Sequence, residues 1–130
     1  MHNVSGLNGK WAHLKDENFE AYLKMATNMK VDLEISIQFD HFVMRQVSGM
    51  NTVTVECTLD KEYEETLLDG RKFMTTLVVA GENRLESSQK ATKPSDKSTK
   101  GTRYLADKDT MIFTGECNGV KCTRTYKRKQ

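Results

Sequence analysis

The sequence has few prolines, no excess of charge of one sign and no long apolar segment. Only one of its 130 residues is proline, and 20 Lys and Arg against 18 Asp and Glu leave a net charge of +2. That balance gives no signature of nucleic-acid or membrane binding. Apolar runs stay below the roughly 20 residues of a membrane-spanning helix. The length and composition therefore predict one domain with a core of its own.

Cysteine is also scarce, and its number is odd. The chain has three cysteines, so at least one has no disulfide partner within the chain. The first ten residues, Met1–Lys10, lack the apolar centre of a signal peptide. We therefore expect a reduced, cytoplasmic protein without disulfides. No spacing of histidines, cysteines or acids indicates a metal site, and no motif calls for a cofactor.

Apolar and polar residues alternate along most of the chain, in short segments separated by turn sequences such as Asp69-Gly70. An antiparallel up-and-down meander of this kind avoids open edges by closing on itself, and a barrel of this size has room for a small ligand. We predict a ten-stranded β-barrel. The expected strands are Gly6–Leu14, Asp32–Phe39, Phe42–Ser48, Asn51–Leu59, Glu62–Leu68, Lys72–Ala80, Arg84–Ala91, Thr99–Ala106, Thr110–Cys117 and Val120–Arg128.

One segment, Asp16–Ala26, follows the helical period instead. Phe19, Tyr22, Leu23 and Ala26 recur at i, i+3, i+4 and i+7, and acidic residues stand in the first turn. We expect a single short amphipathic helix that covers the sheet as a lid.

The last two strands are joined by Asn118-Gly119, the strongest short-range hairpin signal, because a type I′ turn needs positive φ at both central residues. The turn sets the register, in which directly opposed residues share a face. The pairs are Cys117 with Val120, Gly115 with Cys122, Phe113 with Arg124, and Met111 with Tyr126. Since the lysines of the final strand belong in water, Arg124 and Tyr126 should point inward.

The preceding strand is expected to bring a second arginine to the same face. If Asp107–Asp109 forms a three-residue loop, Ala106 pairs with Thr110 and Arg103 lies opposite Phe113. The two inward arginines then stand two strands apart, roughly 10 Å across the sheet. A loop of two or four residues would instead turn Arg103 outward.

Two readings of this group remain open. Two guanidiniums and a phenol inside a sheet suit a carboxylate ligand, because the guanidinium fork matches carboxylate geometry. Alternatively, Arg124 forms a structural ion pair with an inward Asp or Glu, since buried charges are paired. Further side chains are predicted to line the ligand cavity or to belong to the core: Met44, Val53, Val55, Met74, Met111, Phe113 and Cys122.

Several short motifs, in order and spacing, resemble the intracellular lipid-binding proteins, the family of fatty-acid-binding and cellular retinoid-binding proteins. The resemblance covers nearly the whole chain. The motifs are Gly9-Lys-Trp11, Asn18-Phe-Glu-Ala-Tyr-Leu-Lys24, Lys61-Glu-Tyr-Glu-Glu65, Asp69-Gly-Arg-Lys-Phe-Met-Thr-Thr76, Gln89-Lys90 and Cys122-Thr-Arg-Thr-Tyr126. The resemblance implies a clamshell barrel of ten strands with a helix-turn-helix lid that carries one apolar molecule with a polar head.

Residue by residue, Arg124 and Tyr126 match the Arg-x-Tyr that holds the carboxylate in the family's acid-binding members, and Arg103 matches their earlier arginine. Retinol-binding members have Gln and Phe on the last strand and Gln at the earlier position, so the resemblance implies a fatty acid or retinoic acid. The protein would be a monomeric carrier, not an enzyme, with no nucleic-acid partner. One departure is the stretch 27–31, which is too short for the second lid helix and puts lid-mediated transient membrane contact in doubt.

Two other functions remain as alternatives. A barrel that has lost its ligand together with its lid would act through protein contacts. Less favoured is an enzyme that uses the inner arginine, tyrosine and cysteine, since no base stands at a recognisable spacing.

Overall fold

The computed structural model describes residues 3–18, 31–49, 51–66, 70–95, 97–117 and 119–129. Within them the chain forms one 3₁₀ turn and ten strands that hydrogen-bond into a single antiparallel sheet. The elements are η1 (Ser5–Leu7), β1 (Gly9–Glu17), β2 (Asp32–Gln38), β3 (His41–Ser48), β4 (Asn51–Thr58), β5 (Tyr63–Thr66), β6 (Lys72–Gly81), β7 (Arg84–Ala91), β8 (Thr99–Asp107), β9 (Thr110–Cys117) and β10 (Val120–Arg128).

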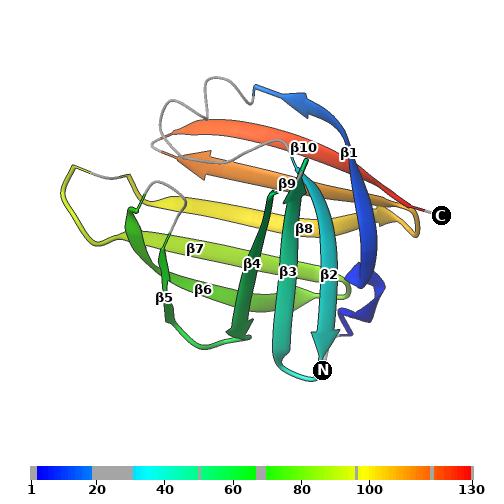
Figure 1. The fold of residues 1–130 in the computed structure, drawn as a ribbon, viewed down its shortest axis with the longest axis horizontal. Helices are drawn as coiled ribbons and strands as arrows, with labels where there is room; N and C mark the ends of the chain where they lie inside the picture. Colours follow the sequence, from blue (N-terminus) through cyan, green and yellow to red (C-terminus); the bar gives the residue numbers. More distant parts are fainter. Residues whose placement is uncertain are drawn as a thin grey trace.

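The strands pair with their sequence neighbours, and the first strand also pairs with the last. The order across the sheet is β4-β3-β2-β1-β10-β9-β8-β7-β6-β5, which leaves β4 and β5 at its edges. In Figure 1, β2–β4 cross in front of β6–β10, and β1 runs along the side that connects these two groups. This is the clamshell form of a nearly closed barrel, and it confirms the predicted ten-stranded architecture.

The core lies on the inner face of the curved sheet. Along β2, Leu33, Ile35 and Ile37 are buried, whereas Ser36 and Gln38 between and beyond them are exposed. This is the period of two that a sheet with one buried face requires. The largest fully buried side chains include Trp11 and Tyr126, from the two strands that close the sheet.

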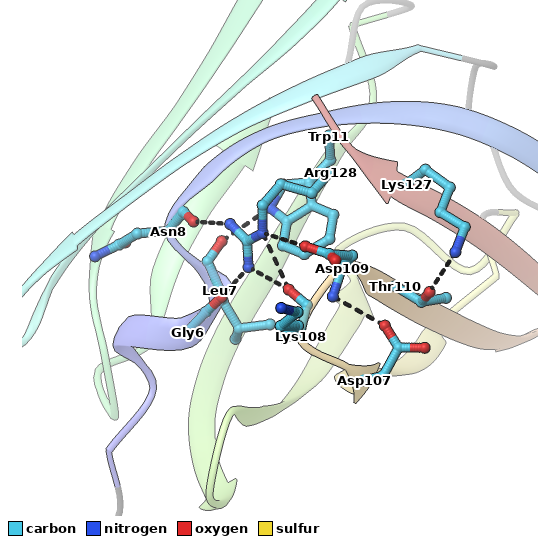
Figure 2. A network of polar contacts seen from close by, with 10 residues as sticks. All are labelled: Gly6, Leu7, Asn8, Trp11, Asp107, Lys108, Asp109, Thr110, Lys127 and Arg128. Carbon is cyan, nitrogen blue, oxygen red and sulfur yellow. Dashed lines mark hydrogen bonds and ion pairs between the residues drawn. The ribbon is translucent and has the colours of Figure 1, made fainter. Parts of the chain in front are cut away.

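Arg128, near the end of β10, joins the N-terminal turn to the β8–β9 turn (Figure 2). Its Nη1 donates to the carbonyl oxygen of Asn8 at 2.8 Å, and its Nη2 donates to those of Gly6 and Lys108, each at 2.9 Å. The guanidinium also stacks 4.2 Å from the ring of Trp11. One side chain thus ties the N-terminal turn, the first strand and the β8–β9 turn together.

The prediction that a lid helix begins at Asp16 is wrong. Asp16 and Glu17 belong to β1, which continues to pair with β10 through these residues. The pairing shifts between His13 and Lys15, so that Leu14 is the extra residue of a β-bulge and is 53 % exposed. Asn18 is described and lies outside any helix, and residues 19–26 of the predicted helix lie outside the described residues. No helix in the described part of the chain is long and apolar enough to cross a membrane.

The length predicted for the loop between β8 and β9 is also wrong, but the predicted pairing of Arg103 with Phe113 is confirmed. Asp107 pairs with Thr110 across a two-residue turn, and the register then shifts between Leu105 and Asp107. The extra residue in this second bulge, Ala106, restores the alternation. Arg103 therefore lies opposite Phe113, as predicted.

Candidate functional site

The final hairpin has the predicted register and places two functional candidates inside the barrel. Arg124 pairs with Phe113, and Tyr126 pairs with Met111. Arg124 and Tyr126 are only 4 % and 2 % exposed. The Arg124 guanidinium lies 5.8 Å from the centre of the Tyr126 ring, so the two side chains run alongside each other on the inner face.

Arg103 joins them from β8. Its guanidinium stacks 5.0 Å from the Phe113 ring, and its positive charge lowers the pKa of the Tyr126 phenol. The residue is partly exposed as a whole, but its Nη1 is buried and has no hydrogen-bond partner among the described residues. A buried guanidinium N–H without an acceptor is costly, so this atom marks a place where an acceptor belongs.

The packing around Phe113 requires a glycine on the neighbouring strand. A Cβ at Gly101 would come 2.6 Å from the Phe113 ring and 2.8 Å from the Ser87 hydroxyl. Because the ring occupies this space, it forms an apolar surface against which Arg103 is held.

Asp16 supplies a carboxylate to the same group. It lies opposite Arg124 in the pairing of β1 with β10, and its Oδ1 accepts a hydrogen bond from Arg124 Nε at 3.1 Å. The two side chains are 7 % and 5 % exposed, which makes this a buried ion pair. The second oxygen, Oδ2, is buried and has no hydrogen-bond partner among the described residues.

His13 completes the group on β1. Its Nε2 lies 2.8 Å from Asp16 Oδ1, and with Asp16 ionised the ring N–H is the donor. The His13 ring meets the Tyr126 ring edge to face, with centres 5.8 Å apart. The bulge at Leu14 explains this geometry, because it brings two residues three positions apart to the same face of the strand.

Burial sets the electrostatics of these groups. It raises the pKa of the Tyr126 phenol, while Arg103 and Arg124 oppose the shift. Burial also lowers the pKa of Arg103, and Tyr126 opposes that change. The thiol of Cys122 has a raised pKa for the same reason, which disfavours a nucleophilic role. Among the described residues, the charged groups that act on Tyr126 are Arg103, Arg124 and Asp16, and their formal charges sum to +1.

A second polar cluster lies further along the inner face. Glu65 Oε1 accepts hydrogen bonds from Thr75 Oγ1 at 2.9 Å and from Gln89 Nε2 at 2.8 Å, and Thr99 donates to Gln89. Nearby, burial and the Glu65 carboxylate raise the pKa of Tyr63. These hydrogen bonds link the residues to one another, so the cluster stabilises β5–β8 and gives no separate sign of a ligand.

All but one of the predicted lining residues lie on the inner face of the sheet. Met44 and Met111 are in the buried core cluster, and Val55 and Phe113 pack against it. Cys122 is buried opposite Gly115, and Val53 is partly buried on the same face as Val55. Met74 lies on the other side of the sheet.

The expectation for Met74 is therefore wrong. It pairs with Glu64 and Lys90, which are exposed, whereas its neighbours Phe73 and Thr75 are the buried residues of β6. A hollow of about 490 Å³ lies over this outer side of β6–β10, among residues such as Lys100, Glu116 and Lys121. It is not part of the arginine site.

The described residues form neither a disulfide nor a cluster suited to a metal ion. All three cysteines lie in described segments, are buried and form no disulfide. Among the described residues, no three His, Cys, Asp or Glu side chains come together to hold a metal ion.

Sequence reasoning missed Asp16 and His13. His13 falls near the end of the predicted first strand, and Asp16 begins the predicted helix, where acidic residues are typical of the first turn. The alternation of a regular strand from Trp11 would put residues 13, 15 and 17 inward, and Asp16 outward. The bulge at Leu14 turns Asp16 inward, and nothing in the local sequence predicts this bulge.

No family model matches the chain, but individual relatives match along nearly all of it. It is 35 % identical to fatty acid-binding protein homolog 6 of Caenorhabditis elegans, over 93 % of this chain and 96 % of that protein. It is 32 % identical to retinol-binding protein 1 of Rattus norvegicus, over 93 % and 95 %. Human cellular retinoic acid-binding protein 2 is 28 % identical over 97 % of this chain and the whole of that protein.

Solved structures agree on the architecture. A protein described as REP1-NXSQ fatty acid transporter superposes with a TM-score of 0.83 at 30 % identity, covering 97 % of this chain and 98 % of that one. Apo lipid binding protein 8 of Caenorhabditis elegans superposes with a TM-score of 0.87 over 99 % of both chains; at 22 % identity it supports the fold alone.

Proposed function

The chain belongs to the intracellular lipid-binding protein family, and we propose that it is a cytoplasmic, non-enzymatic carrier of one long-chain apolar carboxylic acid, a fatty acid or retinoic acid. The acid head would lie at Arg103, Arg124 and Tyr126, and the tail would lie against the inner apolar residues. Burial of the tail supplies the affinity, at about 0.8 kcal/mol for each CH₂ group.

The observation that carries this proposal is the buried Arg103 Nη1, which has no acceptor among the described residues. A carboxylate provides acceptors in the geometry that a guanidinium fork prefers. It also carries the single negative charge that would balance the sum of +1 around Tyr126. A neutral alcohol would leave that charge in place, so the site favours acids even though one relative is named as a retinol-binding protein.

The ion pair between Asp16 and Arg124 supports a second candidate. If Arg124 serves mainly to neutralise Asp16, the barrel would hold no ligand and would act through protein contacts. This candidate leaves the buried Arg103 Nη1 unexplained, so we rank it second.

Competition binding separates the two candidates. Palmitate and hexadecanol would each displace a fluorescent fatty acid from the wild-type protein, from Arg103→Gln and from a control, Arg84→Gln. Arg84 stacks on Tyr104 from an exposed position on the adjacent strand, away from the site. We expect Arg103→Gln to weaken palmitate binding by about tenfold or more, because a hydrogen bond to a charged group is lost, and to leave hexadecanol nearly unchanged. Equal palmitate binding in all three proteins, or no uptake by any of them, would contradict the proposal.

A further inference from the structure

We propose that Asp16 is a specificity-determining residue of the head-group site and selects acids that carry a hydroxyl on the carbon next to the carboxyl group, that is, 2-hydroxy acids. This inference rests on the proposed function and deepens it. It concerns which acid is preferred, not whether an acid binds.

The first observation is an unused acceptor. Asp16 Oδ1 is occupied by Arg124 Nε and His13 Nε2, at 3.1 and 2.8 Å. Its Oδ2 is buried and accepts nothing from the described residues. The side chain is 7 % exposed, so bulk water does not readily satisfy this oxygen. A buried carboxylate oxygen in this state favours a ligand that brings a hydrogen-bond donor.

The second observation is an unused donor, Arg103 Nη1, on the other side of the same group. Contacts connect the two residues: the Arg103 guanidinium stacks on Phe113, Phe113 lies opposite Arg124, and Arg124 Nε donates to Asp16. Strand pairing therefore places the acceptor of Asp16 and the donor of Arg103 at the two ends of one row of residues, with Arg124 and Phe113 between them.

A simple fatty acid satisfies only half of this arrangement. Its carboxylate has acceptors for Arg103, but it has no donor for Asp16 and is repelled by that carboxylate. A 2-hydroxyl group lies directly beside the carboxylate and can donate to Asp16 Oδ2. The head group as a whole still carries one negative charge, which matches the sum of +1. A long-chain alcohol supplies a donor but no charge.

The test is a series of four ligands on the wild-type protein, again by displacement of a fluorescent fatty acid. Palmitate is the reference, the two enantiomers of 2-hydroxypalmitate carry the hydroxyl beside the head, and 16-hydroxypalmitate carries it at the far end. We expect one enantiomer of 2-hydroxypalmitate to bind about tenfold tighter than palmitate, because it adds a hydrogen bond to a buried charge. The other enantiomer and 16-hydroxypalmitate should gain little.

Asp16→Asn then identifies the residue responsible. Asparagine keeps the shape but removes the charge, so palmitate should bind tighter and the preference for the 2-hydroxy acid should fall to within about twofold. Asp107→Asn is the matched control, because Asp107 accepts a hydrogen bond from the Asp109 backbone N–H in the β8–β9 turn and bonds none of the site residues. It should keep the wild-type preference.

The outcomes separate this inference from the proposed function. If palmitate and both hydroxy acids bind equally, or if 16-hydroxypalmitate gains as much as the 2-hydroxy acids, the role of Asp16 is refuted while the carrier function stands. A preference that persists in Asp16→Asn also refutes it. If no acid binds, the proposed function itself fails. If Asp16→Asn does not fold, the wild-type ligand series decides.

Discussion

Asp16 and Arg124 lie directly opposite each other on the two strands that close the barrel, and they form a buried ion pair with Arg124 Nε 3.1 Å from Asp16 Oδ1. Loss of one partner leaves the other as an uncompensated buried charge. The pair is therefore both a stabilising contact and a part of the head-group site, and these two roles can be measured separately.

The stability role predicts a strongly non-additive mutant cycle. Arg124→Gln should lower the free energy of unfolding by about 3–5 kcal/mol, because Asp16 is left buried without a cation. The double variant Asp16→Asn, Arg124→Gln should recover much of that loss, since neither charge remains. Urea denaturation of the two single variants and the double variant measures this coupling. Additive losses would show that the ion pair contributes little.

Arg128 gives a second prediction, at the place where β10 meets the N-terminal turn and the β8–β9 turn. Arg128→Lys should lower the free energy of unfolding by about 2 kcal/mol or more, because an ammonium group cannot bond three carbonyls in a plane and stack on Trp11 at once. Lys127→Gln is the control: it loses an exposed hydrogen bond to Thr110 and an attraction to the exposed Asp107, and should stay within about 0.5 kcal/mol of wild type. Thermal and urea denaturation compare the two variants.

The pH dependence of stability gives a third. The hydrogen bond from the His13 backbone N–H, aided by Lys129, lowers the pKa of Asp32 below its ordinary 3.8. A depressed pKa in the folded state adds stability above the unfolded pKa, and this stability is lost as pH falls through the folded pKa. Asp32→Asn should thus be less stable than wild type at pH 7, and the difference should shrink below pH 4. A difference that stays constant between pH 7 and pH 2 would disprove this origin.

A fourth prediction concerns the β2–β3 turn. Phe39 has a φ of 56° and is fully exposed. The left-handed conformation raises the free energy of the folded state, and the exposed side chain makes no packing contacts that would offset this. Phe39→Asn should raise the free energy of unfolding by up to about 1 kcal/mol, because asparagine tolerates this conformation. Phe39→Val, which is β-branched, should lower it. The opposite order of the two variants in urea denaturation would show that the Phe39 side chain stabilises the turn.

The last hairpin could be predicted because its turn sequence sets the register of the two strands that it joins, β9 and β10. The sequence Asn118-Gly119 predicts a two-residue turn, and the register that follows from it puts Phe113 opposite Arg124, as the pairing of β9 with β10 confirms. The alternation of charged and apolar residues then determines which face is buried. Local chemistry and long-range structure agree here, so pattern reasoning suffices.

Bulges mark the limit of that reasoning. The inward position of Arg103 was predicted from a three-residue loop, but the protein reaches it with a two-residue turn and an extra residue at Ala106. At Leu14 the same kind of irregularity turned Asp16 inward, where the sequence predicted a helix start. A bulge depends on how two strands fit together, so the sequence of one strand does not reveal it.

The central claim is that the barrel carries an acidic lipid at Arg103. Native and denaturing mass spectrometry of protein purified without added lipid tests it most directly, with Arg103→Gln purified in parallel. We predict one bound acidic lipid for each wild-type chain and a much lower occupancy in the variant. An empty wild-type protein that also fails to take up a fluorescent fatty acid would contradict the account, and would favour a barrel that acts through protein contacts.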